Sequence, residues 1–341
     1  MKSIAFFNNK GGVGKTTLAC NVVAYLNSEL GKRVLLIDAD PQCNATQAVL
    51  DDDICERIYE DGSTEKSLYS YVKPLEHGEP RIDDRITPLK GLDNRFGTDI
   101  IPGHPRLSII EDTLSEAWAS VQARNVGGYR TTNWCKQLLS SVESSYDYAV
   151  FDVGPSLGAL NRSVILACDF IVTPFGCDIF SLLGIKNISS WISTWKLQYD
   201  RSILDGLRDH PGVLESYPIV IDTEHQFRFV GYSVQQYITK TFKTGRRPVK
   251  SYEQIMREIP STVETAMDFL RPTMLSAQDL ELGHIPNLFS LVPMAQSAKA
   301  PIHDLGNSDG LVGSQYSQVT AYTSTLDALT RKLLRNLERA G

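Results

Sequence analysis

Two lysines and three glycines lie close together near the start of the chain, in the stretch Lys10-Gly11-Gly12-Val13-Gly14-Lys15-Thr16-Thr17. Glycines leave backbone N–H groups open to an anion, because no side chain blocks the approach. A lysine after the last glycine can reach the outer phosphates of a nucleotide, and the next hydroxyl can coordinate Mg²⁺. The stretch therefore predicts a phosphate-binding loop, with Lys15 on the phosphates and Thr16 on the metal.

The residues on both sides of this loop predict the elements that must hold it. Residues 4–7 form an apolar run that is typical of a buried strand, and Leu18, Val22 and Leu26 recur with a helical period. A strand, a glycine-rich turn and a helix are the context that a phosphate-binding loop requires, since the helix directs its positive end at the anion.

Carboxylates follow two further predicted strands. Residues 33–38 are mostly aliphatic and end at Asp38, with Asp40 two residues later, and residues 146–151 precede Asp152. Ligands of open α/β sheets bind at the carboxyl ends of the strands, so these side chains are expected to face the loop. From the residues alone, a helix cap and a solvated loop acid remain an alternative for the first two. For Asp152 we predict a role in organising Mg²⁺.

The glycine loop departs from the general pattern, which has a glycine at the position of Asn9. Here Lys10 precedes the glycines instead, and the variant KGGVGKTT resembles the deviant phosphate loop of the ParA/MinD ATPases. The resemblance implies that Lys10 crosses a dimer interface to the ATP of a partner subunit. Two subunits then enclose two nucleotides, and hydrolysis releases the dimer.

Other segments extend the resemblance from Lys2 to about Leu337. The tip Asp-Ala-Asp-Pro-Gln resembles the family's switch segment, in which Asp40 would orient the attacking water and Asp38 would support the Mg²⁺ shell. After Asp152, the chain has Val153 and Gly154 where the family often has Thr-Pro. The resemblance implies ATP and Mg²⁺ as cofactors and the following site residues: catalytic Lys10, Lys15 and Asp40; nucleotide-binding Gly11, Gly12, Val13, Gly14, Lys15, Thr16, Thr17, Pro293 and Met294; and Mg²⁺-organising Thr16, Asp38 and Asp152.

Alternating strands and helices predict an α/β fold with one doubly wound, mainly parallel sheet. The resemblance implies that this sheet is that of a P-loop NTPase of the ParA/MinD type. Later strands are expected at residues 168–174, 218–222 and 289–294, and amphipathic helices at 134–142, 180–199 and 322–339. We interpret residues 1–341 as a single ParA-like ATPase domain with insert-like segments at about 51–97 and 223–285.

Composition limits the class of protein. The 341 residues are 42% hydrophobic and 22% charged, as is ordinary for a globular chain, and the formal net charge is −6. The six cysteines form no CxxC pair, which argues against a metal-cluster carrier of the same superfamily and favours reduced thiols. No apolar run approaches the ~18 residues of a membrane span. We expect a cytoplasmic protein, associated with the nucleoid if it binds DNA.

A basic window interrupts this acidic chain. Residues 237–257 contain six basic residues and one acidic residue, which gives a local charge of +5. The window can contact a phosphate backbone, or it can be a solvated helix face and loop. ParA-type proteins bind non-specific DNA through basic residues, which favours DNA here. The candidate contacts are Lys240, Lys243, Arg246, Arg247 and Lys250.

The family resemblance sets the expected function. It implies a slow intrinsic ATPase that forms a homodimer with ATP, binds DNA non-specifically, and is stimulated by a ParB-like partner. Only nine residues precede Lys10, so we expect no DNA-reading domain before the loop.

Two alternatives remain. A ParA-like regulator could control another effector system. A MinD-like ATPase could place the basic, leucine-lined segment 322–339 on a membrane, although packing of its leucines on the sheet explains the same pattern, and we do not expect membrane binding.

Overall fold

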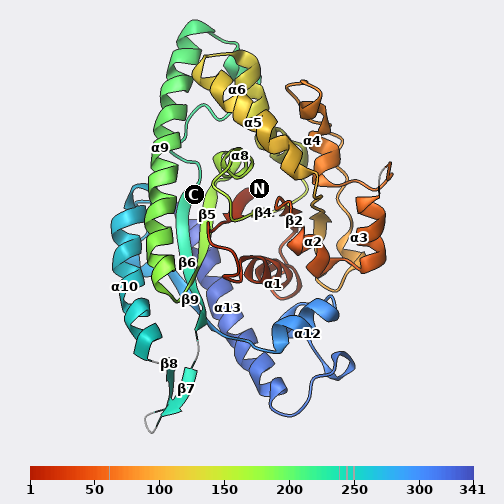
Figure 1. The fold of residues 1–341 in the computed structure, drawn as a ribbon, viewed down its shortest axis with the longest axis vertical. Helices are drawn as coiled ribbons and strands as arrows, with labels where there is room; N and C mark the ends of the chain where they lie inside the picture. The colour runs from red at the N-terminus through yellow and green to blue at the C-terminus, as the bar shows by residue number, and fades with distance from the viewer. Residues whose placement is uncertain (61, 238, 243–244, 249) are drawn as a thin grey trace.

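A computed structural model describes residues 1–60, 62–237, 239–242, 245–248 and 250–341. Its centre is a seven-stranded sheet with the order β3-β2-β4-β1-β5-β6-β9, in which every neighbouring pair is parallel (Figure 1). The strands are β1 (Lys2–Phe6), β2 (Val34–Asp38), β3 (Asp99–Ile101), β4 (Tyr148–Asp152), β5 (Phe170–Gly176), β6 (Arg228–Tyr237) and β9 (Glu281–Pro286). The predicted doubly wound α/β fold is confirmed.

Helices cover both faces of this sheet. The helices α1 and α13 contact each other on one side, and α5, α7, α8 and α9 pack together on the other (Figure 1). The helices are α1 (Lys15–Ser28), α2 (Asn44–Val49), α3 (Asp52–Tyr59), α4 (Leu68–Glu76), α5 (Leu107–Gln122), α6 (Val126–Thr132), α7 (Trp134–Val142), α8 (Ala159–Ala167), α9 (Ile179–Asp209), α10 (Lys250–Met267), α11 (Ala277–Leu280), α12 (Leu291–Ser297) and α13 (Gln315–Ala340).

Double coverage explains the composition of the central strands. Every residue of β2 (VLLID) and of β4 (YAVFD) is buried. Strands covered on both faces are apolar throughout, without the alternation of apolar and polar residues seen in half-exposed strands. This continuous apolar pattern is why the sequence predicted them. Each strand ends in a carboxylate, so the apolar core stops where the functional edge of the sheet begins.

Two of the predicted strands are wrong. At residues 218–222 the backbone is irregular, because Val220 bonds to side chains instead of a neighbouring strand. Its N–H donates to Asn133 Oδ1 at 3.0 Å, and its carbonyl accepts from the Tyr199 hydroxyl at 2.8 Å. Residues 289–294 run into α12, after Phe289 turns the chain with a left-handed φ of 45°.

The segment after β6 forms a separate small structure. Strands β7 (Thr239–Phe242) and β8 (Gly245–Pro248) pair as an antiparallel hairpin at one end of the long axis of the molecule (Figure 1). Helix α10 follows and packs on α9. This arrangement places the basic window next to the sheet edge at which β6 ends.

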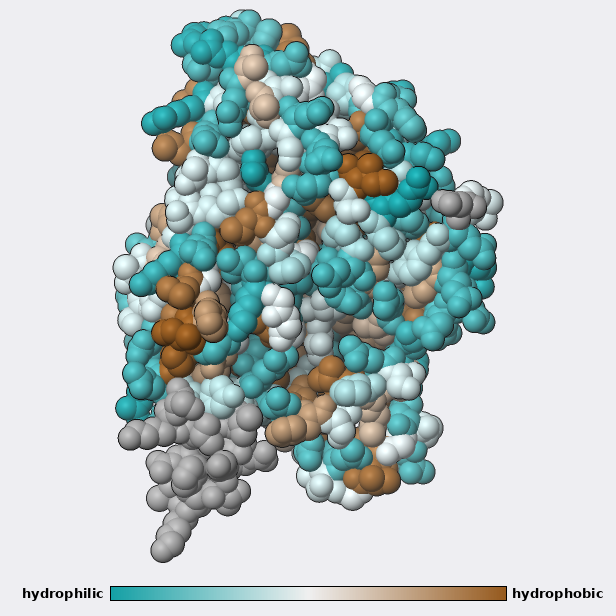
Figure 2. All heavy atoms as spheres, viewed as in Figure 1, coloured by the Kyte–Doolittle hydropathy of each residue, from teal (hydrophilic) through white to brown (hydrophobic). Residues whose placement is uncertain are grey.

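One end of α9 carries exposed apolar side chains. Ile179, Phe180 and Leu183 are 54%, 68% and 52% exposed, and Figure 2 shows apolar surface over this end of the helix, near the lower left of the view. A contiguous apolar surface of this kind is typical of a contact site for another protein.

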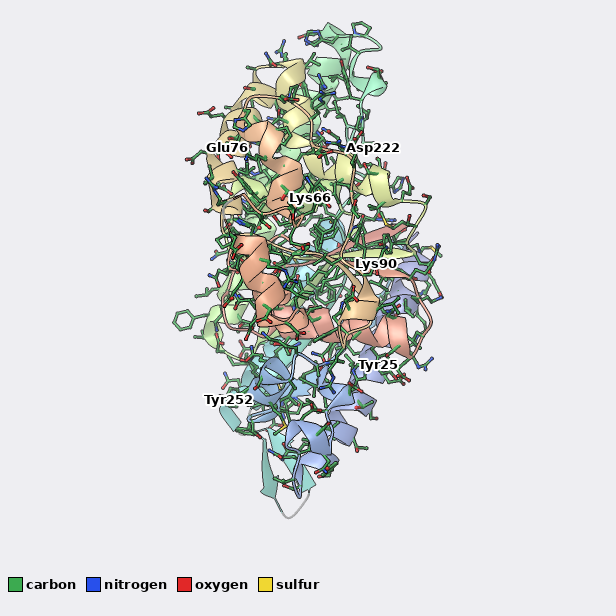
Figure 3. All side chains as sticks on the ribbon, turned by 90° about the vertical axis from the view of Figure 1, so that its right-hand side faces the viewer. Tyr25, Lys66, Glu76, Lys90, Asp222 and Tyr252 are labelled. Carbon is green, nitrogen blue, oxygen red and sulfur yellow. The ribbon has the colours of Figure 1, made fainter. Side chains whose placement is uncertain are left out.

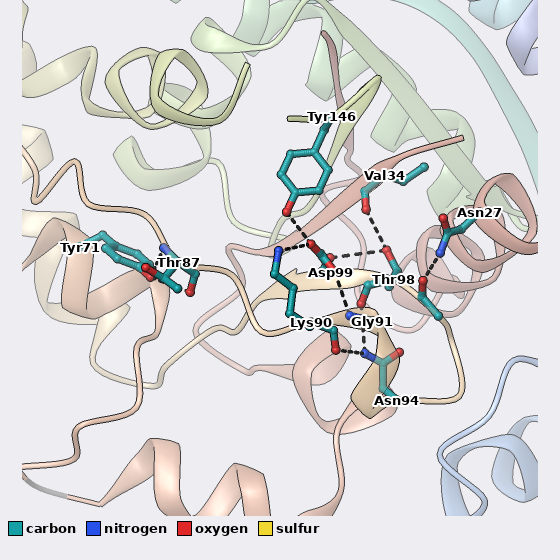
Figure 4. A network of polar contacts seen from close by, with 11 residues as sticks. Asn27, Val34, Tyr71, Thr87, Lys90, Gly91, Asn94, Thr98, Asp99 and Tyr146 are labelled. Carbon is teal, nitrogen blue, oxygen red and sulfur yellow. Dashed lines mark hydrogen bonds and ion pairs between the residues drawn. The ribbon is translucent and has the colours of Figure 1, made fainter. Parts of the chain in front are cut away.

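The segment between β2 and β3 lies on the outside of the molecule. Figure 3 shows α3 and α4 on the side that faces the viewer, with Lys66 labelled in the connection between them and Glu76 at the end of α4. This segment returns to the sheet through a polar network at Asp99, the first residue of β3 (Figure 4). Asp99 accepts hydrogen bonds from Lys90 Nζ and Gly91 N, both at 2.8 Å, and from the Tyr146 hydroxyl at 2.6 Å.

This network predicts a pH-dependent contribution to stability. Burial raises the pKa of Asp99, but the hydrogen bonds from Lys90, Tyr146 and the Gly91 N–H outweigh it, so the pKa lies below its ordinary value. The carboxylate therefore stabilises the fold above about pH 4, and this contribution is lost as the pH falls through the folded pKa. We expect Asp99→Asn to cost about 2 kcal/mol at pH 7. Urea unfolding should show the difference from wild type shrinking towards about pH 3.5; a constant difference would contradict the assignment.

Candidate nucleotide-binding site

Three strand ends bring the predicted site residues together. Strand β4 lies between β1 and β2. Asp152, the last residue of β4, is paired with Phe6 of β1 on one side and with Asp38 of β2 on the other. The glycine loop follows β1 directly. The loop and the two carboxylates from distant parts of the sequence therefore meet at one edge of the sheet, as parallel strands require.

The glycine loop has the backbone that only glycine adopts without strain. Gly12 and Gly14 have left-handed φ values of 73° and 79°, and Gly14 precedes the first turn of α1. A Cβ added at Gly11 or Gly12 would meet no atom within 4 Å, so the loop borders open space. That space is a cavity of about 600 Å³ lined by the loop, Lys15, Thr16 and Thr17. An anion can approach the loop backbone here without displacing a side chain.

Lys15 and Thr16 converge on one buried carboxylate. Lys15 Nζ lies 3.3 Å from Asp152 Oδ1, and the Thr16 hydroxyl donates to Asp152 Oδ2 at 2.6 Å. The Lys15 side chain is only 8% exposed, and that of Asp152 is fully buried. A buried carboxylate is costly without a cation, so this pair stabilises the loop in the conformation seen here.

Asp38 is a second buried carboxylate at the same edge. It accepts hydrogen bonds from the Thr46 N–H and hydroxyl, both at 2.7 Å. The pKa of Asp38 is raised to about 7, mainly by burial and also by the negative charge of Asp152. A nearby divalent cation would relieve this crowding of negative charge. Two carboxylates and the Thr16 hydroxyl are hard oxygen ligands that suit Mg²⁺, so the residues present fit the metal.

Asp40 lines the cavity beside these groups. The Gln42 N–H donates to its Oδ1 at 3.0 Å, which fixes the carboxylate. A Cβ added at Gly154 would lie 3.0 Å from the same oxygen, so the loop after β4 approaches Asp40 closely. This contact leaves little room for a side chain at Gly154.

Lys10 also lines the cavity, and its side chain pairs with a carboxylate other than Asp152. Its ammonium pairs with the carboxylate of Asp178, and the two side chains are 34% and 37% exposed. Asp178 also caps α9, because its Oδ1 accepts from the Ser181 N–H at 3.1 Å. The first lysine of the loop thus pairs with a carboxylate of the same chain, next to the exposed apolar end of α9.

The far wall of the cavity was missed by the sequence analysis. It comes from α12 and the residues after it, and from the end of β6; the lining residues are Val292, Ala295, Gln296, Lys299 and Gln236. Pro293 and Met294 lie on α12 but do not line the cavity, because a helix presents only one face to it. The spacing of Val292 and Ala295 is the helical signal that could have identified this wall.

Comparison with known proteins agrees with this geometry. The family model described as an AAA domain matches residues 1–204, which is more than half of the chain. The chain belongs to the ParA/MinD family of P-loop ATPases. The chromosome partitioning protein ParA of Caulobacter vibrioides is 33% identical over 190 residues, 55% of this chain and 61% of the relative. The chain thus spans less than two thirds of the length of the curated relatives it matches first.

The likeness to solved structures extends over nearly the whole chain. Protein DIP2308 from Corynebacterium diphtheriae is 33% identical with a TM-score of 0.77, and 99% of each chain is covered. The complex of Cyanothece McdA with ATP has a TM-score of 0.57 and 15% identity, with 96% of each chain covered, and shows the fold alone.

The C-terminal helix of this ParA/MinD-family chain does not offer an apolar face to a membrane. Its leucines, predicted either to pack or to contact a bilayer, are at most 1% exposed: Leu326, Leu329, Leu333 and Leu337. Lys332 Nζ donates to the Gln278 and Glu281 carbonyls at 2.9 and 2.6 Å. The packing interpretation is therefore confirmed. None of the helices in the described ranges is long and apolar enough to cross a membrane.

The structure places the candidate DNA contacts only in part. Four of them lie on the described backbone of β7, β8 and the start of α10, and their side chains are outside the described set: Lys240, Arg246, Arg247 and Lys250. Lys243 lies outside the described residues altogether.

Proposed function

We propose that this chain is an ATP-hydrolysing switch that dimerises around ATP and Mg²⁺ and then binds DNA without sequence preference. The convergence of Lys15, Thr16 and Asp152 beneath a glycine loop that opens on a cavity carries this proposal. The relative named as chromosome partitioning protein ParA supports it. Hydrolysis releases the dimer, at a slow intrinsic rate that a ParB-like partner raises.

The chain's own residues perform the hydrolysis mostly by placing charge. The loop N–H groups hold the phosphates, and Lys15 moves its ammonium from Asp152 to the outer phosphates. Asp40, fixed by the Gln42 N–H, orients the attacking water. Bound Mg²⁺, held through Thr16 with Asp152 and Asp38 behind it, would neutralise phosphate charge. Because no covalent enzyme intermediate is needed, small displacements of these groups control the rate.

Dimerisation would complete the site with Lys10 from the second subunit. Lys10 and Asp178 form an ion pair whose side chains are 34% and 37% exposed. Ion pairs exposed to solvent contribute only about 0–1 kcal/mol to the stability of the fold. Lys10 can therefore exchange Asp178 for the phosphates of a partner's nucleotide at little cost. The exposed Ile179, Phe180 and Leu183 lie next to this pair in sequence and provide apolar surface for the contact.

DNA would bind through the basic hairpin at the end of the molecule. The segment has no base-reading motif, so its contacts are expected with the phosphate backbone, and affinity should fall steeply with salt. A dimer presents two hairpins, and two linked sites bind a long polymer much more tightly than one. ATP-dependent dimerisation therefore gives ATP-dependent DNA binding.

This DNA-binding step can be tested with a charge-neutral hairpin. We expect wild-type protein with ATPγS and Mg²⁺ to shift random-sequence DNA, and ADP to weaken the shift about tenfold or more. Arg246→Gln with Arg247→Gln should lower affinity about tenfold at ~0.1 M salt and reduce the slope of log K against log salt. The matched control is Arg201→Gln with Arg208→Gln on the exposed face of α9, which removes the same charge elsewhere. Equal loss in both double variants would mean that the hairpin is not the contact.

A further inference from the structure

The end of β6 lies against the glycine loop in a way that the proposed chemistry does not use. Gln236 lines the cavity and its side chain is exposed there. A Cβ built on Gly14 would lie 3.2 Å from Gln236 Nε2 and 3.4 Å from Gln235 Oε1. Two consecutive glutamine amides therefore border the residue at which the loop turns into α1.

This arrangement requires an irregular strand. Successive side chains of a regular strand point to opposite faces, so Gln235 and Gln236 could not both approach Gly14. The pairing of β6 with β9 shifts its register between Gln235 and Tyr237, and Gln236 has a left-handed φ of 60°. Bulges of this kind re-aim side chains beside functional sites, and a left-handed backbone is unfavourable for a residue with a Cβ. An unfavourable conformation at a cavity wall points to a function for the side chain that it directs.

The two amides have different roles. Gln235 is 4% exposed, and its Nε2 donates to Ser233 Oγ at 2.9 Å, which leaves its oxygen towards Gly14. It forms a fixed wall behind the loop. Gln236 places its Nε2 nearest to Gly14 and stands in the cavity, where an amide N–H can donate to a ligand oxygen.

We propose that Gln236 is a nucleotide-contacting residue that donates its side-chain N–H to the diphosphate part of the nucleotide beside Gly14. The inference rests on nucleotide binding at the glycine loop, but not on dimerisation or DNA binding. Gln236 lies outside the residues 1–204 that the family model matches. The C-terminal part of the chain thus supplies a direct contact that the N-terminal motifs do not reveal.

The decisive variant is Gln236→Gly. Glycine adopts a left-handed φ without a Cβ penalty, so the nucleotide-free protein should keep or raise its Tm. A hydrogen bond to a charged oxygen is lost, so ADP and ATPγS should both bind about tenfold more weakly. Affinities would be measured by titration calorimetry with Mg²⁺, and Tm by thermal unfolding without nucleotide. A merely structural role would lower Tm and leave both affinities unchanged.

The matched control is Phe289→Gly. Phe289 also has a left-handed φ, at 45°, and is 61% exposed, but it does not line the cavity. Its variant should bind both nucleotides as wild type does. The proposal is overturned if Gln236→Gly binds ADP within twofold of wild type, if only ATPγS binding weakens, or if both glycine variants weaken binding equally. Wild-type protein that bound neither nucleotide would instead refute nucleotide binding at the loop.

Discussion

Lys15→Gln is expected to lower the kcat of ATP hydrolysis at least about 100-fold and to weaken ATP binding about tenfold or more. Lys15 follows the last glycine of the loop and is nearly buried, with Nζ 3.3 Å from Asp152 Oδ1. Glutamine can replace a hydrogen bond but not a charge. The phosphates then lose the ammonium that would neutralise them as charge develops during transfer.

The same substitution also changes the balance of charge among the buried carboxylates. Asp152 loses the coulombic attraction of Lys15, which at present opposes the rise in its pKa caused by burial. Nucleotide-free Lys15→Gln protein should therefore be less stable, because Asp38 and Asp152 remain buried side by side without a cation. Thermal unfolding must accompany the assay to separate lost chemistry from lost fold.

Lys66→Gln is the matched control for this experiment. Lys66 is exposed, lies between α3 and α4, and does not line the cavity (Figure 3). Phosphate release and fluorescent-nucleotide binding should both match wild type in this variant. Folded Lys15→Gln protein that hydrolysed ATP within threefold of wild type would refute the assignment of the site.

The positions of the candidate site residues at strand ends were predictable because their sequence signals are local and continuous. The apolar runs of β1, β2 and β4 end at the loop, at Asp38 and at Asp152, and parallel strands bring such ends to one edge. The glycine spacing fixed the conformation of the loop independently. The sequence therefore predicted the side of the cavity that the glycine loop and the strand-end carboxylates form.

The opposite side of the cavity could not be predicted in the same way. The sequence of β6 is not typical of a buried strand, because Ser233 and two glutamines interrupt its apolar run. The strand also ends in a bulge, and its place in the sheet is defined by pairing with β5 and β9. The wall formed by α12 follows a turn at Phe289, which has a left-handed backbone. Such turns are usually recognised in a sequence by a glycine, and this one has a phenylalanine instead. Such features depend on tertiary contacts rather than on local periodicity, so a strand was expected where a helix forms.

Lys10→Ala is expected to abolish ATP-dependent dimerisation while the monomer still binds nucleotide. Lys15 and the glycine backbone remain, so the affinity of the monomer for ATPγS should stay within about threefold of wild type. The partner's phosphates lose one buried charge contact on each side of a symmetric interface, and removing a buried charged partner typically costs about 2–5 kcal/mol. Size-exclusion chromatography with light scattering, with ATPγS and with ADP, measures the dimer directly.

Asp178→Asn distinguishes this function of Lys10 from a structural one. Lys10 pairs with Asp178 at the start of α9 within one subunit, so Lys10→Ala could act by loosening that helix. Asparagine remains a good helix cap but does not attract the ammonium. If Lys10 serves the partner's nucleotide, Asp178→Asn frees it and dimerisation with ATPγS is as strong as in wild type or stronger. If Lys10 only fastens α9, both variants lose the dimer alike, and the proposed contact between subunits is wrong.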